Sequence, residues 1–424
     1  MTGSQPADVT IHVRRTPEYM HLEFSALNPK ATGFTATLSS KRVDDARKQL
    51  DWGLKALKDS LPGLRVEAEC LDKTYTALSR LSHLVRSALF GPRNVREGVR
   101  KFLAEALPPG SSPDHPPLIE YVGSMDSQIP LEFLPLYFHD EASAISSADD
   151  FIRACRAFLG FSCIVRRVFP ETPLPKSSIA MTTSPGNQLP VRYLYYEGLR
   201  GAKEELTWFT TSAARYVQLE GPYPGAVRDA PGLAEQIFDP SLLLAGGRRT
   251  VPDQIQHFAC HCYTTAEDPF DNEIELSGNG TSTVATIRDL MADLDRLLDD
   301  VGGAPADDMP LIFMNACGAS RLRAATTASF PRLFLDNGNR GFIGAEIEMP
   351  DEAAAAFSKA LYQKFLLHRQ PLGSSVLYAR NHLLYEYCNP LGISYTTYAD
   401  PQIHISPASA ELDQKDGSNV ATAS

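Results

Sequence analysis

Apolar and polar residues alternate along the first part of the chain and then follow a helical period. Three alternating runs lie within residues 9–43 and are separated by Pro, Asn and Gly, which predicts a three-stranded meander. Residues 44–60 and 69–107 carry apolar side chains at helical spacing and contain Pro–Gly breaks. We therefore expect an N-terminal module of a β-meander and helices over residues 1–107.

The pattern changes after the Pro-, Gly- and Ser-rich stretch 108–113. Short runs that are apolar on both faces recur, and a helical stretch follows each of them. Such runs are typical of parallel strands that helices cover on both sides, although an α+β fold could have the same spacing. The expected pairs of strand and helix are 192–196 with 202–216, 255–260 with 287–298, 311–315 with 327–335, and 341–345 with 352–367.

These elements predict an α/β domain over residues 108–406, with a mostly parallel sheet flanked by helices. Residues 407–424 are mostly small or polar, and this composition predicts a disordered tail.

Composition narrows the possible partners of the 424-residue chain. Its formal net charge is −11, which disfavours direct binding of nucleic acid. No apolar run is long enough to span a membrane, and the first residues do not resemble a secretory signal. The 7 cysteines include no C-x-x-C pair, so we expect free thiols in a reducing cytoplasm.

The segment 256–262 combines two histidines with two cysteines and raises the question of a metal site. Alternate residues of a strand face opposite sides, so Cys260 and Cys262 would point away from His261. His257 would share a face with His261 but lie roughly 13 Å away along an extended strand, too far for one ion. We therefore predict no metal here and no cofactor, although ligands from distant segments would keep a metal-binding module open.

Cys317 follows the apolar run 311–315 and precedes Gly318, so it lies at the exit of a predicted strand. His261 lies at the end of another such run, and ligands of open α/β sheets bind at the carboxyl ends of the strands. An imidazole beside a cysteine can take its proton and make the thiolate nucleophilic. Two buried residues that end two core strands would have the same spacing, so this pattern alone leaves both interpretations open.

At these segments the sequence closely resembles the CHAT family of caspase-like, clan CD peptidases. His261 matches the catalytic histidine in H-F-A-x-H, and Cys317 matches the nucleophile in N-A-C-G. Their separation (317 − 261 = 56) is similar to the caspase spacing of roughly fifty residues. Further segments that resemble the family are 128–136, 199–205, 341–346 with 350–351, and 389–392 with 398–401.

The resemblance implies a caspase-like sheet and a Cys–His dyad that cleaves proteins through an acyl-enzyme. It also implies an oxyanion hole formed by the backbone amides of Cys262 and Cys317. The family usually has glycine at the position of Cys262, and only glycine adopts positive φ freely. Metacaspase-like relatives have Asp at the position of Asn315, where it selects basic substrates. Asn315 is neutral, so we expect it in the substrate pocket together with Glu346, which would supply the negative charge instead. We expect Asp351 to cap the helix that follows it.

Several bacterial CHAT peptidases act in immune or cell-death pathways, and some cut gasdermins. The resemblance therefore implies a protein substrate, for example a gasdermin-like protein, and an activating partner. We expect the Gly-, Ser- and Asp-rich segments 277–285 and 299–308 to be mobile gating loops. The alternative is a catalytically silent caspase-like scaffold that binds partner proteins.

Overall fold

We describe the fold from a computed structural model of the chain. The structure describes residues 6–61, 63–107, 116–135, 145–171, 179–223, 229–243, 246–263, 268–300, 309–316 and 329–406. The stretch 108–113 and the tail predicted over 407–424 lie outside these residues.

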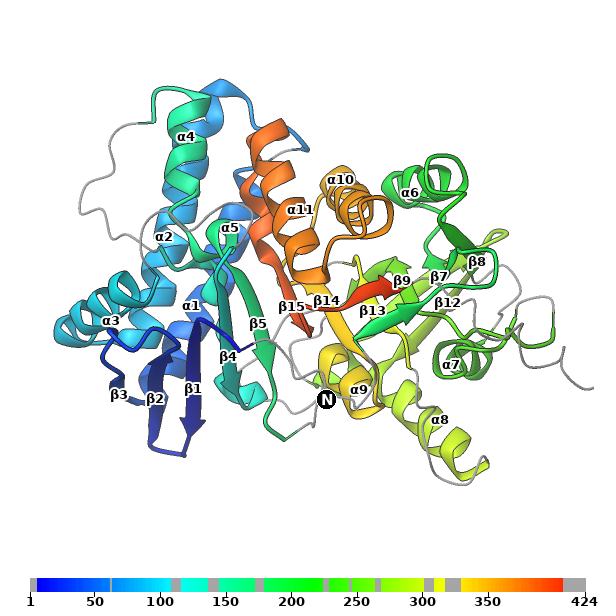
Figure 1. Cartoon of the computed structure of the whole chain (residues 1–424), viewed down its shortest axis with the longest axis horizontal. Coiled ribbons are helices and arrows are strands. Elements are labelled where there is room, and N and C mark those ends of the chain that lie inside the picture. The colour runs from blue at the N-terminus through cyan, green and yellow to red at the C-terminus, as the bar shows by residue number, and fades with distance from the viewer. Residues whose placement is uncertain are drawn as a thin grey trace, which may run out of the picture.

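A six-stranded sheet forms the centre of the C-terminal part of the chain (Figure 1). Its order is β15-β14-β13-β9-β7-β8, and only β15 runs antiparallel to its neighbour. The strands are β7 (Leu189–Tyr195), β8 (Val217–Tyr223), β9 (Ile255–Ala259), β13 (Leu311–Met314), β14 (Gly341–Ala345) and β15 (Tyr395–Ala399). The prediction of a mostly parallel sheet is therefore confirmed.

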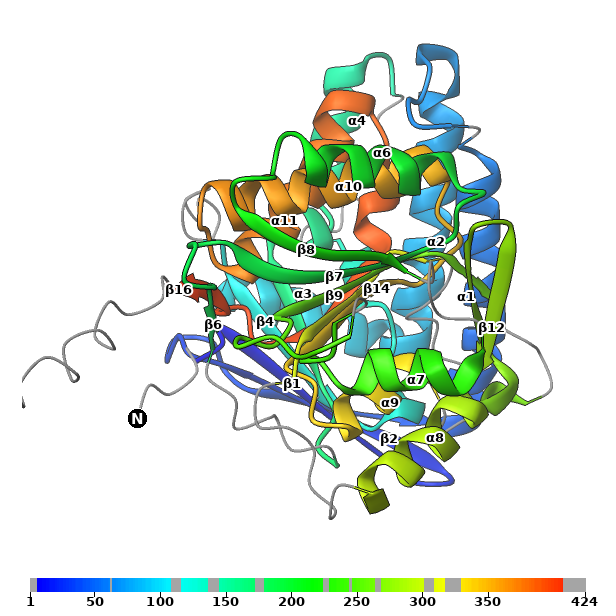
Figure 2. The ribbon, with the colours of Figure 1, turned by 90° about the vertical axis from the view of Figure 1, so that its right-hand side faces the viewer.

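Helices cover both faces of this sheet (Figure 2). One face packs against α6 (Arg200–Thr210), α10 (Asp351–Tyr362) and α11 (Leu372–Tyr387), and the other against α7 (Ala230–Phe238), α8 (Ile287–Asp300) and α9 (Phe330–Asp336). Along β13, Phe313 belongs to the first apolar core, whereas Ile312 and Met314 belong to the second. Burial on both faces explains why these strands are continuously apolar, and the α/β class is confirmed.

Three of the predicted helices differ in extent from those observed. The stretch predicted over 202–216 is helical only in α6, and the one over 352–367 continues from α10 as a π-helical turn, Gln363–Leu367. Helix α9 is shorter than predicted, and residues 327–328 lie outside the described residues.

The N-terminal residues form a second sheet with the order β3-β2-β1-β4-β5. Strands β1 (Val9–Arg15), β2 (Tyr19–Ala26) and β3 (Phe34–Ser39) form the predicted antiparallel meander. Strand β4 (Leu118–Gly123) joins β1 in parallel, and β5 (Ile164–Val168) follows it. The boundary near residue 107 stays a prediction, and strands from both sides of it hydrogen-bond in one sheet.

Helices pack against this sheet and complete the N-terminal core. They are α1 (Ser40–Asp59), α2 (Leu71–Phe90) and α3 (Arg93–Ala106), with α4 (Ala148–Cys155) and α5 (Leu159–Ser162) nearby (Figure 1). Helix α2 ends at Gly91, whose φ of 48° places it in the left-handed region that glycine adopts most readily. The predicted helices of this module are thus confirmed. A short parallel pair, β6 (Ala180–Thr182) and β16 (His404–Ser406), lies elsewhere.

A buried ionic cluster joins the two large sheets. Arg167 of β5 lies 2.7 Å from a carboxylate oxygen of Glu132 and 2.7 Å from one of Glu346. It also donates a hydrogen bond to the Tyr398 hydroxyl of β15, at 3.2 Å. Nearby, Arg380 of α11 contacts the other oxygen of Glu132 at 3.6 Å. Buried charges of this kind are tolerated only when they are paired, so the cluster fixes how β5 meets β14 and β15.

None of the described helices is both long enough and apolar enough to cross a membrane.

Gly341 tests how tightly the central sheet is packed. A Cβ at this position would lie 2.3 Å from the Ala399 Cβ and 2.8 Å from its Cα. We expect Gly341→Ala to lower the free energy of unfolding by about 1–3 kcal/mol, because the two strands must move apart. Chemical denaturation measures this change. Gly63→Ala is the matched control, since a Cβ there meets no atom within 4 Å, and an equal loss in both variants would contradict the packing.

Candidate active site

The strands β7, β9 and β13 end at one edge of the six-stranded sheet, as their parallel pairing requires. The chain continues in register just beyond the strands. Tyr196 donates its backbone N–H to the Ala259 carbonyl at 2.9 Å, and Asn315 donates its N–H to the Phe258 carbonyl at 2.8 Å. The segments that follow β7, β9 and β13 therefore lie side by side at this edge.

His261 lies just beyond β9 and is partly exposed. Cys260 forms a bend, and a new strand, β10 (His261–Tyr263), begins after it. The sequence-based expectation of one extended strand through 256–262 is therefore wrong. The expected difference in environment is observed nevertheless, because Cys260 and Cys262 are buried in an apolar core, unlike His261.

The two histidines of the H-F-A-x-H segment have different surroundings. His257 stays within β9 and is fully buried. The ring of His261 lies 4.6 Å from that of Tyr196 and 5.8 Å from that of Tyr263, measured between centroids. Within the described residues, no three His, Cys, Asp or Glu side chains are grouped so as to hold a metal ion.

A three-stranded sheet presents His261 on its open face. Strand β10 pairs with β11 (Glu273–Gly278), which pairs with β12 (Thr281–Thr286). His261, Glu275 and Val284 form one row across this sheet, and all three are at least partly exposed. The row of Cys262 with Ile274 and Ala285 faces the opposite side and is buried. The small sheet therefore has one core face and one face that carries the candidate catalytic histidine.

The segment 277–285 is a tight hairpin and not the gating loop that its composition predicted. Asn279 and Gly280 have φ of 54° and 77°, as the two central residues of a type I′ turn require. The turn is also tethered, because the Gly280 N–H donates to Glu197 Oε1 at 2.9 Å and Ser277 Oγ accepts the Glu197 N–H at 2.8 Å. Of the second expected loop, 299–308, residues 301–308 lie outside the described residues.

Cys317, the predicted nucleophile, lies outside the described residues, and Ala316 is the last described residue before it. Its role, and that of its backbone amide in an oxyanion hole, stay predictions. The role of the Cys262 backbone amide in the oxyanion hole is also a prediction. However, Cys262 is not among the described non-glycine residues with positive φ, so its backbone does not require glycine.

Asn315 lies directly after β13, and its side chain points into the core and is buried. Its Nδ2 donates to Glu205 Oε1 at 2.8 Å and to the Ala354 carbonyl at 3.1 Å. Its Oδ1 accepts a hydrogen bond from the Tyr395 hydroxyl. Asn315 is therefore engaged by three elements of the core, and its predicted place in a substrate pocket remains a prediction.

Glu346, the other predicted pocket residue, directly follows β14 and is buried. Its carboxylate forms the ion pair with Arg167 described above. A basic substrate side chain that used Glu346 would therefore share this carboxylate with Arg167. Its role in selecting substrates also remains a prediction.

Asp351 caps a helix, although not the expected one. It is the first residue of α10, whose N-cap is Pro350. Its Oδ2 accepts a hydrogen bond from the backbone N–H of Gly201 at 2.8 Å, in the first turn of α6. The N-cap residue of α6 is Leu199, whose apolar side chain cannot accept a hydrogen bond from the backbone. The expectation that Asp351 caps its own helix is therefore wrong.

Sequence reasoning missed Tyr196, Tyr263 and Glu275, which surround His261. The Tyr263 hydroxyl donates to a carboxylate oxygen of Glu275 at 3.0 Å. Partial burial, together with this hydrogen bond and the charge of Glu275, raises the pKa of Tyr263 to about 12. The alternation of polar and apolar residues in 261–263 and 273–278 was the signal that could have found this sheet face.

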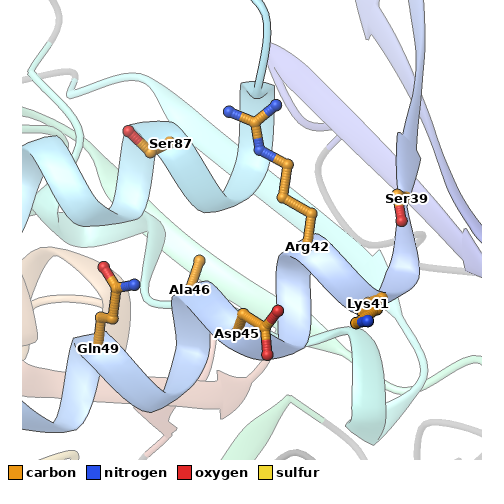
Figure 3. Close-up of a pocket in the computed structure, with 7 residues that line it drawn as sticks. All are labelled: Ser39, Lys41, Arg42, Asp45, Ala46, Gln49 and Ser87. Carbon is orange, nitrogen blue, oxygen red and sulfur yellow. The ribbon is translucent and has the colours of Figure 1, made fainter.

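A separate pocket of about 400 Å³ lies in the N-terminal half, far from His261 (Figure 3). It opens between the start of α1 and the last turn of α2. Its lining residues are Ser39, Lys41, Arg42, Asp45, Ala46, Gln49 and Ser87. It contains none of the predicted site residues.

A family model matches the part of the chain that holds the candidate site. Residues 233–401 match the model of the CHAT domain. The matched residues include His261, Cys317, Asn315 and Glu346, whereas Glu205 precedes the CHAT match. The resemblance of the two motif segments to the CHAT family is thereby confirmed.

Comparison with individual proteins adds partial matches. A probable protease of Vitiosangium sp. (strain GDMCC 1.1324) is 31% identical over 103 residues, which are 24% of this chain and 13% of that protein. The aligned residues are thus a small part of this curated relative. Two crystal structures of the Saccharomyces cerevisiae separase–securin complex align with TM-scores of 0.47 and 0.46, at 10% and 9% identity. Each alignment covers 94% of this chain and 30% of the matched chain.

The interaction of Tyr263 with Glu275 can be tested by titration. We expect Glu275→Gln to lower the pKa of Tyr263 from about 12 toward its usual value near 10, because the neutral amide no longer disfavours the phenolate. NMR of ring-labelled tyrosine follows the titration, and Tyr263→Phe identifies the signal. An unchanged pKa would show that Glu275 does not act on this hydroxyl.

Proposed function

We propose that the chain is a caspase-like cysteine endopeptidase with Cys317 as nucleophile and His261 as its proton acceptor. One observation carries this proposal, the parallel register of β9 and β13. Met314 pairs with Phe258, 56 positions earlier (314 − 258 = 56). Cys317 and His261 have the same separation (317 − 261 = 56) and follow this pair by three residues each. The register therefore supports a dyad at the carboxyl edge of the sheet.

The proposed reaction follows from the chemistry of a thiol beside an imidazole. His261 accepts the proton of Cys317, and the thiolate attacks the carbonyl carbon of the scissile peptide. The C–N bond breaks as His261 returns the proton to the leaving amine, and a thioester remains on Cys317. His261 then takes a proton from water, which attacks the thioester and releases the carboxylic acid and the thiol.

The surroundings of His261 are suited to this role. Its ring contacts two tyrosine rings yet remains partly exposed, so a peptide on the open face of β10–β12 could reach it. The backbone amides of Cys262 and Cys317 are the proposed oxyanion donors, and the ordinary backbone of Cys262 is compatible with this. No metal or cofactor takes part in the proposed reaction.

We propose a protein as the substrate, cleaved by a regulated effector of bacterial defence or cell death. The CHAT match supports the peptidase class, and the curated relative is itself named a probable protease. A gasdermin-like substrate, an activating partner and a location in the cytoplasm belong to the same proposal. The net charge of −11 supports a protein rather than a nucleic acid as the direct partner.

A peptide-library cleavage assay tests the dyad. We expect the wild type to cleave peptides, and Cys317→Ala and His261→Ala each to lower kcat/KM by at least about a thousandfold, because either change removes the activated nucleophile. Mass spectrometry of the products measures the rate and identifies the cleaved bond.

Two matched variants control for loss of a thiol or an imidazole elsewhere. Cys70 is a partly exposed free cysteine, and His12 is exposed on β1. Cys70→Ala and His12→Ala should cleave like the wild type. Equal cleavage by all five proteins would refute the dyad, whereas binding of a partner without cleavage by any of them would favour the scaffold.

A further inference from the structure

The buried carboxylate of Glu205 contacts both segments that lead to the proposed dyad. Glu205 belongs to α6 and is 2% exposed. Its Oε1 accepts a hydrogen bond from Asn315 Nδ2 at 2.8 Å, and its Oε2 lies 2.9 Å from His257 Nε2. Asn315 comes two positions before Cys317, and His257 four positions before His261. One side chain thus contacts β9 and the residue that follows β13, close to where each leads into the proposed site.

Two further elements contribute to the same cluster. Ser358 of α10 donates its hydroxyl to Glu205 Oε2 at 2.8 Å. Tyr395 of β15 donates its hydroxyl to Asn315 Oδ1, while its ring stacks on Phe357 with centroids 3.6 Å apart. The orientation of Asn315 is therefore set from both sides of its amide.

Aromatic rings enclose the imidazole of His257. The rings of Tyr193, Phe209, Phe313 and Tyr362 lie with their centroids 5.2, 5.8, 4.7 and 5.5 Å from its own. Its ring nitrogens have no aligned hydrogen bond among the described residues, so the short contact with Glu205 is an ion-pair distance without hydrogen-bond geometry. Packing and this single polar contact together determine where the imidazole lies.

A buried polar cluster in this position is an inefficient way to stabilise the fold. Burying a carboxylate carries a desolvation penalty, and apolar residues of the same shape often stabilise a core at least as well. What the polar groups add is direction, because each hydrogen bond requires a particular distance and angle. In a site where a misplacement of about 1 Å can cost about a hundredfold in rate, such direction has a use.

We infer that Glu205 is a positioning residue for the proposed dyad. Its carboxylate contacts both Asn315 and His257 and so fixes their positions relative to each other. Through the short segments that follow these two residues, it orients Cys317 relative to His261. This inference rests on the proposed function. It extends that function to a residue of α6 that lies outside the matched CHAT residues.

Two substitutions at Glu205 separate its contacts from its charge. Glu205→Ala removes the acceptors of Asn315 and Ser358 together. Glu205→Gln keeps both bonds, since the amide oxygen can face Asn315 and the amide N–H can donate to the Ser358 hydroxyl. The matched control is Asp253→Asn at the opposite edge of the same sheet. Asp253 is likewise buried, and it pairs with Arg192 and Arg249.

The experiment measures alkylation of Cys317 by iodoacetamide from pH 5 to 9, with mass spectrometry of the Cys317 peptide. This readout reports thiolate formation and needs no substrate. We expect an apparent thiol pKa in the wild type below the ordinary ~8.5, and an ordinary value in His261→Ala. We expect Glu205→Ala to slow alkylation at pH 7 about tenfold, and Glu205→Gln to be alkylated at the wild-type rate. Asp253→Asn should lower Tm without changing the pH profile.

The outcomes distinguish failure of the inference from failure of the proposed function. A wild-type profile in Glu205→Ala, or an equal slowing in Asp253→Asn, would overturn the positioning role while the dyad stands. If His261→Ala has the same pH profile of alkylation as the wild type, the dyad is overturned, and the inference with it. If Glu205→Ala does not fold, Tyr395→Phe replaces it, since it removes one hydrogen bond on Asn315 and keeps the ring. About threefold slower alkylation supports the inference, and an unchanged rate contradicts it.

Discussion

The parallel pairing of β9 with β13 is the constraint on which the proposed site depends. Parallel strands end at the same edge of a sheet, so whatever follows β9 lies beside whatever follows β13. The Asn315 N–H bonded to the Phe258 carbonyl carries this alignment past the last paired residues. Strands β7 and β14 extend the same edge on either side. The register determines that His261 and the expected site of Cys317 lie at the same edge, and the pairing of β10 with β11 then places His261 on its own strand.

Buried polar clusters then fix the edge relative to the rest of the fold. Glu205 links the helical layer of α6 and α10 to β9 and to the end of β13, and Arg167 links the N-terminal sheet to the end of β14. Both clusters lie near the carboxyl ends of the central strands, where a reactive group would have to be held in place. The N-terminal sheet is therefore coupled to this edge by charge as well as by apolar contact.

Much of the fold could be predicted from the sequence, because burial determines the pattern of apolar residues. The meander over 9–43 and the strands that end at Ala259, Met314 and Ala345 follow from periods that local geometry imposes. The hairpin over 273–286 could also have been predicted, since Asn279-Gly280 is a strong turn signal, yet the segment 277–285 was interpreted as a loop from its composition. Composition misled there because an exposed strand face is polar like a loop.

Contacts between distant residues could not be predicted in this way. Asp351 was expected to cap the helix that follows it, but it accepts a hydrogen bond from Gly201, which lies 150 positions earlier in the sequence, and only the packed fold brings the two together. Glu346 was expected in the substrate pocket, and its ion pair with Arg167, which the sequence did not predict, depends on how the two sheets meet. The bend at Cys260 likewise depends on the pairing of β10 with β11. The most direct test of the whole account is a crystal structure of the active chain that resolves Cys317. We expect the Cys317 sulfur within about 4 Å of a ring nitrogen of His261, and a cysteine held on the opposite face of the sheet would contradict the proposed dyad.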